Sequence, residues 1–96
     1  MSAELDPVIH PVHRLQICAL LANADEMEFA LLRDELGVSD SVLSKQIKYL
    51  DDAGYLTIRK VPSTGRPRSW YSLSKDGQRA FQKHLDALRV IAALAT

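Results

Sequence analysis

Residues 38–54, VSDSVLSKQIKYLDDAG, predict a helix whose start, inner face and end can be read from its side chains. Ser39 or Asp40 can cap the first turn, because a side-chain oxygen there accepts a hydrogen bond from an otherwise unpaired backbone N–H. Gly54 provides the end. Three apolar side chains follow the i, i+4, i+7 spacing of one helix face: Leu43, Ile47 and Leu50. We therefore expect these three to point into a core.

The preceding segment, MEFALLRDELG (residues 27–37), predicts another helix. Phe29, Leu32 and Leu36 lie on one stripe, and Gly37 is a natural left-handed end. Only about three residues separate this helix from the next. A short, glycine-containing turn between two helices is the signature of a helix-turn-helix.

The outer face of the helix in residues 38–54 is hydroxylated or cationic near its start. A turn of about 100° per residue points Ser41, Lys45 and Lys48 away from the core, with Ser44 on the flank. Such side chains can meet base edges and phosphates in the major groove of DNA. An ordinary solvated helix face explains the same pattern equally well, so the neighbouring segments must decide between the two.

Residues 55–73 predict a β-hairpin. Two segments have the β-branched or aromatic content of strands: YLTIRK (55–60) and RSWYSL (68–73). The segment between them, VPSTGRP, is rich in the Pro, Ser and Gly residues that favour turns. No Asp or Glu occurs between Asp52 and Asp76, whereas the hairpin carries four bases: Arg59, Lys60, Arg66 and Arg68. An acid-free, basic hairpin is suited to lie along a phosphate backbone.

The two ends of the chain predict one helix each. HPVHRLQICALLANA (residues 10–24) begins near Pro11 and is apolar around most of its circumference, so we expect it to be buried on more than one face. SKDGQRAFQKHLDALRVIAALAT (74–96) follows a Ser74 cap and is longer and more apolar after Leu85 than one core requires. This surplus predicts a homodimer interface, with packing on its own domain as the alternative. The expected interface residues are Ile17, Leu21, Leu85, Leu88, Ile91 and Leu94.

The charges are balanced in number but not in position. Residues 1–40 carry eight acids and two bases, whereas residues 41–96 carry four acids and ten bases. This asymmetry is expected when one face of a domain meets an anionic partner and the other faces away. The zero net charge therefore does not argue against binding to nucleic acid.

Catalysis and metal binding are not expected. Cys18, the single cysteine, lies in an apolar run and is expected to be buried and inert, with a redox or metal sensor as the lesser alternative. His10, His13 and His84 show no triad-like or metal-ligand spacing, and His84 is expected at a surface or interface. We expect no catalytic residue, metal or cofactor. No apolar run approaches the roughly 20 residues of a membrane span, so we expect a cytoplasmic protein.

The order helix, helix-turn-helix, hairpin, closing helix resembles the winged helix-turn-helix transcriptional regulators, and within these the small, single-domain MarR- and ArsR-like proteins. The resemblance covers roughly residues 6–88, from DPVIHPVHRLQICALLA through LSKQIKYLDDAGYLTIRK to GRPRSWYSLSKDGQRAF. Its anchors are Leu32, Gly37, Leu43, Leu50 and Gly54. It implies an α+β, mostly helical winged helix with three helices, a two-stranded wing and a long C-terminal helix. Residues 1–96 would form one domain, with residues 1–9 as an N-terminal arm and residues 75–96 used for dimerisation.

In that family the third helix enters the major groove and the hairpin tip reaches phosphates or the minor groove. By position, the resemblance implies two sets of DNA-binding residues. The helix set is Ser41, Ser44, Lys45, Gln46 and Lys48, and the wing set is Lys60, Arg66 and Arg68. It also implies a sequence-specific regulator that binds double-stranded DNA as a homodimer. We expect this regulator to repress transcription and not to associate with a membrane. A winged-helix adaptor that binds proteins instead of DNA is the alternative, and the sequence identifies no small-molecule or protein effector.

Two residue choices depart from the family's pattern. Asp40 places a negative charge at the start of the helix expected to enter the DNA groove, which is unusual unless Asp40 is the N-terminal cap of that helix. The helix also has no Arg, the side chain that contacts guanine with two hydrogen bonds. We therefore expect modest sequence specificity, or specificity that depends on the wing and on DNA shape. Arg66, near Gly65, is expected in or beside the minor groove, and Trp70 is expected to be a packing residue.

Overall fold

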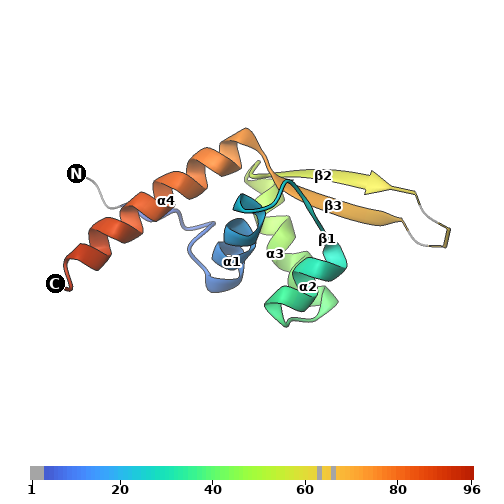
Figure 1. The fold of residues 1–96 in the computed structure, drawn as a ribbon, viewed down its shortest axis with the longest axis horizontal. Coiled ribbons are helices and arrows are strands. Elements are labelled where there is room, and N and C mark those ends of the chain that lie inside the picture. The colour runs from blue at the N-terminus through green and yellow to red at the C-terminus, as the bar shows by residue number, and fades with distance from the viewer. Residues whose placement is uncertain (1–3, 63, 66) are drawn as a thin grey trace.

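A computed structural model describes residues 4–62, 64–65 and 67–96 of the chain. The four helices and the hairpin follow one another in the predicted order, and a three-stranded antiparallel sheet has the strand order β1-β3-β2 (Figure 1). The elements are α1 (Val12–Ala22), β1 (Met27–Glu28), α2 (Phe29–Leu36), α3 (Asp40–Asp52), β2 (Leu56–Val61), β3 (Arg68–Leu73) and α4 (Lys75–Ala93). The predicted α+β, mostly helical winged helix is confirmed.

Helix α3 forms as its side chains predict. Ser39, not Asp40, is the cap, because its hydroxyl accepts a hydrogen bond from the backbone N–H of Val42 (3.2 Å). The backbone of Gly54 is left-handed, with φ of 80°, and ends the helix region. The three apolar residues of the predicted inner face are all buried: Leu43, Ile47 and Leu50.

Helix α2 begins two residues later than predicted, because Met27 and Glu28 form strand β1. Met27 pairs with Tyr71 and Glu28 with Trp70 across from β3. The sheet therefore has a third strand beyond the predicted two-stranded wing. A two-residue strand contains too little alternation to be distinguished from the first turn of a helix. The addition ties the start of the helix-turn-helix to the wing.

The hairpin pairs β2 with β3 from Leu56 opposite Leu73 to Val61 opposite Arg68. Leu56, Leu73 and Tyr71 are buried, and they fix which face of the hairpin covers the core. Trp70 is half-buried with the guanidinium of Arg59 over its ring, as expected of a packing residue. The molecule is elongated, 53 × 26 × 21 Å, because the hairpin extends from one end of the helical core and α4 from the other (Figure 1).

The N-terminal arm is packed against the domain through Asp6, Val8 and Ile9, and its polar groups meet α4 in a cluster. Ile9 belongs to the core. The backbone N–H of Asp6 donates to Nδ1 of His84 (3.0 Å), and Nε2 of His84 lies 3.3 Å from Nδ1 of His10. The Tyr55 hydroxyl donates to the Asp6 carboxylate (2.6 Å), and this hydrogen bond raises the pKa of Tyr55 to about 12.

The expectation for His84 was therefore wrong, since its side chain is 1% exposed and lies inside the protein. A lone histidine in an otherwise apolar stripe gives no sign in sequence that a distant arm folds over it. Burial lowers the pKa of His84 below its ordinary value of 6.5, and the proximity of His10 lowers it further, whereas Asp6 acts in the opposite direction. Nδ1 of His84 accepts a hydrogen bond from the N–H of Asp6. A proton on Nδ1 would make it a second donor facing that N–H, which disfavours the charged form of His84.

This buried histidine predicts a loss of stability in mild acid. The unfolded chain takes up a proton at His84 below about pH 6.5, while the folded chain resists it, so the free energy of unfolding falls as pH decreases through this range. Urea unfolding of the wild type at several pH values between 7.5 and 5.5 measures the slope. His84→Gln should flatten the slope, and His13→Gln, outside the cluster, is the matched control. Equal slopes for the wild type and His84→Gln would contradict the prediction.

Candidate nucleic-acid interface

The outer face of α3 carries the predicted polar residues. Ser41, Ser44, Lys45 and Lys48 are exposed, on the side of the helix opposite its buried leucines. The ammonium of Lys48 lies 3.2 Å from the carboxylate of Asp52 one turn later. Both side chains are well exposed, so this ion pair contributes little to stability and can exchange for a contact with phosphate.

Gln46 lies differently from the other residues of this set. It is half-buried, and its side-chain oxygen accepts a hydrogen bond from Nη1 of Arg14 on α1 (2.8 Å). The Arg14 guanidinium also lies over the ring of Tyr49, 4.4 Å from the ring centroid. Gln46 is thus at the edge of the exposed face, where α3 meets α1. Sequence reasoning missed Arg14, although it is one of only two bases in the first forty residues.

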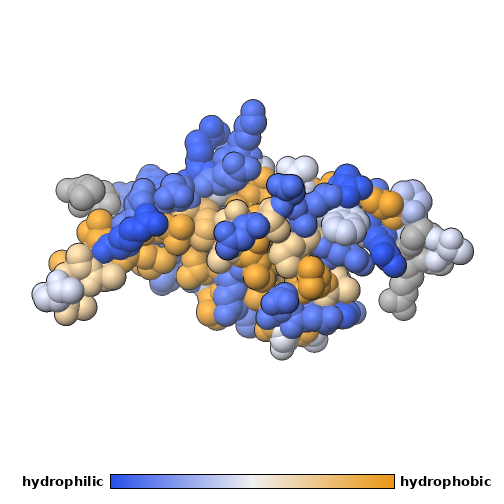
Figure 2. Space-filling model, in the orientation of Figure 1, coloured by the Kyte–Doolittle hydropathy of each residue, from blue (hydrophilic) through white to orange (hydrophobic). Residues whose placement is uncertain are grey.

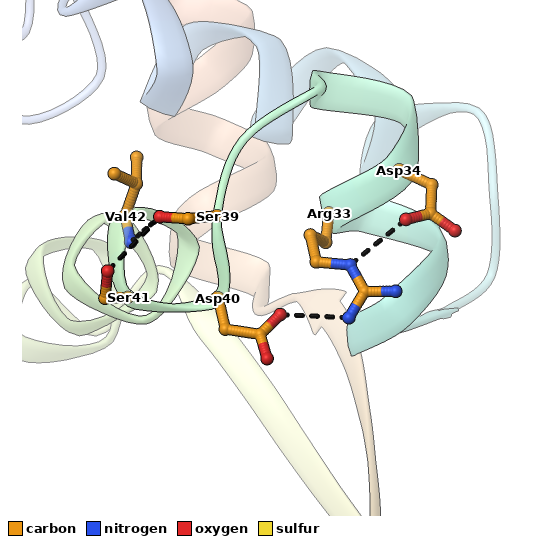
Figure 3. Close-up of polar contacts among 6 residues, drawn as sticks. All are labelled: Arg33, Asp34, Ser39, Asp40, Ser41 and Val42. Atoms are coloured by element: carbon orange, nitrogen blue, oxygen red, sulfur yellow. Dashed lines mark hydrogen bonds and ion pairs between the residues drawn. The ribbon is translucent and has the colours of Figure 1, made fainter.

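The second of those bases, Arg33, explains the unusual acid at the start of α3 (Figure 3). Its guanidinium bonds to Asp40 (2.9 Å) on one side and to Asp34 (3.0 Å) on the other. These hydrogen bonds raise the pKa of Arg33 above its ordinary value. Ser39 performs the capping, with its hydroxyl 3.2 Å from that of Ser41. The charge of Asp40 is therefore countered from α2 rather than used as a cap.

Acidic side chains from another segment reach the base of the wing. Arg59 forms an ion pair with Glu26, whose pKa is lowered by the hydrogen bond from that arginine. Nε of Arg68 lies 3.9 Å from the carboxylate of Glu28 on β1. Lys60 follows Arg59 on β2 and is exposed. The acidic side chains of Glu26 and Glu28 thus partly compensate, in space, the positive charge of a stretch that has no acid in sequence.

Arg66, the remaining residue of the predicted wing set, lies outside the described residues. The described neighbours of the tip border a groove of about 480 Å³ between the wing and the helix-turn-helix. Arg33 and Asp40 line one side of this groove, and Thr64, Gly65 and Arg68 line the other. The start of α3 and the hairpin therefore border the same concave surface.

The residues predicted for a dimer interface fall into two groups. Ile17 and Leu21 are 0% and 3% exposed in the core of the chain itself, so neither has surface to offer a second subunit. Their place on the second face of α1 is filled from within the domain, and we leave them out of the proposed interface. Leu85 and Leu88 are half-buried, whereas Ile91 and Leu94 are 39% and 81% exposed. Figure 2 shows apolar surface gathered along the C-terminal part of α4.

The structure also bears on the expectations for Cys18, for metal ligands and for membrane spans. Cys18 is buried as expected, and burial raises the pKa of its thiol to about 12, which keeps it protonated and unreactive. Within the described part of the chain, no group of three or more His, Cys, Asp or Glu side chains is placed to hold a metal ion. Over the same residues, every helix is too short or too polar to cross a membrane.

Comparison with known proteins agrees with this geometry. A family model described as a winged helix DNA-binding domain matches residues 13–92, and the chain belongs to this family. An uncharacterised protein of Methanocaldococcus jannaschii is 27% identical over 78 residues, which cover 81% of this chain and 85% of that protein. The predicted resemblance to winged helix-turn-helix proteins is confirmed.

Solved structures share the fold. A transcriptional regulator homologue from Pyrococcus horikoshii OT3 superposes with a TM-score of 0.84 at 23% identity, covering 93% of this chain and 89% of that one. ZitR from Lactococcus lactis, a zinc-responsive MarR family member, superposes with a TM-score of 0.68 at 18% identity, covering 99% of this chain and 64% of that one. At these identities the likeness shows the arrangement of helices and strands alone.

Proposed function

We propose that this chain is a sequence-specific transcriptional regulator that binds double-stranded DNA as a homodimer and acts as a repressor by occupying its site. In this proposal α3 enters the major groove through Ser41, Ser44, Lys45 and Lys48, with Gln46 at the edge of the contact. The wing lies on the backbone through Lys60, Arg66 and Arg68. The observation that carries the proposal is the exposed hydroxylated and cationic face of α3 in a chain of the winged helix DNA-binding family. In this proposal one duplex meets both α3 and the wing.

Two exposed bases of the described part of the wing, Lys60 and Arg68, provide the test. Replacing Lys60 and Arg68 together by Ala is expected to weaken binding to every duplex. It should also reduce the slope of log affinity against log salt by up to about two units, because each lost phosphate contact removes roughly 0.9. Fluorescence anisotropy over a salt series, with duplexes selected from a random library by the wild type, measures both quantities.

The matched control removes the same charge elsewhere. Arg79 and Arg89 are exposed on α4, each paired with an aspartate one turn away, and replacing both by Ala should leave the slope unchanged. Identical slopes for the two double variants would show that the wing does not lie on DNA. If the wild type selects no duplex at all, the adaptor function becomes the better explanation.

The dimer is proposed to form through the C-terminal part of α4. This helix has 19 residues, and its second half projects beyond the core with apolar side chains exposed (Figure 1). Pairing with the same surface of a second copy would bury Leu88, Ile91 and Leu94 around a twofold axis. Two recognition helices could then read half-sites about one helical turn apart. No metal or other cofactor is needed for this arrangement, and we expect no enzymatic activity.

Substitution at this surface should separate the subunits without unfolding them. Ile91→Asp combined with Leu94→Asp is expected to convert a dimer into a monomer at micromolar concentration, because charges replace the apolar contact and both positions are exposed in one subunit. Sedimentation equilibrium gives the mass. Leu31→Asp, at an exposed leucine of α2, controls for the added charge. A monomeric wild type would refute this use of α4.

A further inference from the structure

Arg14 of α1 contacts both the N-terminal arm and α3 through a single side chain. Its Nε donates to the backbone carbonyl of Val8, and its Nη1 donates to the side-chain oxygen of Gln46 (2.8 Å). Its guanidinium carbon lies 4.4 Å from the centroid of the Tyr49 ring. Gln46 and Tyr49 are three residues apart, so both face α1 from neighbouring turns of α3. The guanidinium is therefore held on three sides.

This arrangement determines how the amide of Gln46 is turned. A guanidinium has only donors, so the atom of Gln46 that it contacts must be the oxygen, and the amide nitrogen with its two hydrogens is directed elsewhere. A charge-assisted hydrogen bond is roughly twice as strong as a neutral one, and stacking on Tyr49 restricts the movement of the arginine. Gln46 is half-buried at the edge of the exposed face of α3, so the group it offers outward is a donor.

We propose that Arg14 is a positioning residue for DNA recognition, which holds the oxygen of Gln46 and thereby makes Gln46 a hydrogen-bond donor to the major groove. This inference rests on the proposed function. A donor matches the acceptors of the groove, of which guanine offers two, N7 and O6. Paired contact with adenine requires the glutamine oxygen as acceptor as well as the nitrogen as donor. Because Arg14 holds the oxygen toward α1, only the nitrogen of Gln46 is directed to the groove, and we expect it to prefer guanine, with its two acceptors, over adenine, which would need the oxygen as well.

Two variants separate the donor from the rest of the side chain. Gln46→Glu keeps the shape and the contact with Arg14 but replaces the outward donor by an acceptor. Gln46→Ala removes both. Against the best duplex selected by the wild type, we expect both to lose about tenfold or more in affinity, with Glu the weaker binder. Gln82→Glu, on the exposed surface of α4, controls for the added negative charge.

A third variant tests the positioning itself. Arg14→Met keeps an unbranched side chain over Tyr49 but releases the amide of Gln46. Selection of duplexes from a random library should then change the preferred base at the same position that Gln46→Ala changes, by about tenfold in relative affinity. In the protein without DNA, the NMR signal of the Gln46 side-chain amide should shift in Arg14→Met. Thermal unfolding, recorded in parallel, reports any general loss of stability.

The outcomes distinguish this inference from the proposed function. Adenine selected opposite Gln46 by the wild type would overturn the inference, and so would base preferences that all the Gln46 variants leave unchanged. An Arg14→Met variant that binds every duplex more weakly by one common factor would show that Arg14 supports only the fold. A wild type that selects no duplex would remove the proposed function and this inference together, while the NMR shift would still report the contact between the two side chains.

Discussion

Leu43→Ala is expected to lower the free energy of unfolding by about 2–5 kcal/mol, because it opens a cavity at the centre of the domain. The Leu43 side chain is 0% exposed and projects from the first turns of α3 into the core. Removing it leaves the surrounding side chains without contacts that they can only partly restore by moving. Urea unfolding followed by circular dichroism gives the change at a pH where His84 is neutral.

The neighbouring position is the control for this substitution. Val42 lies on the same helix but is 37% exposed. Val42→Ala should therefore change the free energy of unfolding by less than about 0.5 kcal/mol. Losses of equal size at the two positions would mean that the inner and outer faces of α3 are wrongly assigned. The DNA-binding face would then be wrongly assigned as well, since it is defined by its opposition to Leu43.

Gly77→Ala is expected to destabilise the protein by about 1–3 kcal/mol, although alanine normally stabilises a helix relative to glycine by roughly 0.5–1 kcal/mol. The added methyl carbon would lie 2.1 Å from the backbone oxygen of Tyr55 and 2.9 Å from its carbonyl carbon. That oxygen also accepts a hydrogen bond from the N–H of Ser74 (2.9 Å). Because backbone rather than a side-chain tip blocks the methyl group, α4 or the start of the wing has to move.

Thermal unfolding measures this effect, and Gln82→Ala on the exposed side of α4 provides a comparison at an open helix position, where little change is expected. A Gly77→Ala variant as stable as the wild type would show that the first turn of α4 can tilt away from Tyr55. The same variant also tests how rigidly the wing is attached, because Tyr55 directly precedes β2.

The helices and the hairpin were predictable because their signals are local and repeated. Leu43, Ile47 and Leu50 mark one face of α3 whatever packs against them, and Gly37 and Gly54 mark ends that depend only on backbone conformation. Strand β1 was not predictable, because two residues carry no period and become a strand only when β3 lies beside them.

The same distinction applies to the candidate site. Helical geometry was sufficient to predict which side chains of α3 are exposed, and those positions agree with the structure. The partners of those side chains were not predictable, because they come from elsewhere in the chain. Arg14 reaches Gln46 across 32 positions, and Glu26 reaches Arg59 across 33. Neither residue stands in a motif, and each gains its role only when the tertiary fold brings the segments together.

The junction between α4 and the wing leaves no room for adjustment. The Ser74 hydroxyl donates to the carbonyl of Gly54 (2.6 Å) and accepts from the N–H of Gly77 (3.0 Å), while the backbone of Tyr55 fills the space beside Gly77. In the proposed dimer the helices that join the subunits are thereby fixed to the parts that touch DNA. The two α3 helices of the dimer would then stand at a fixed separation. A DNA site with one base pair more or less between its two halves would be discriminated against by its spacing, even if both halves had the right sequence.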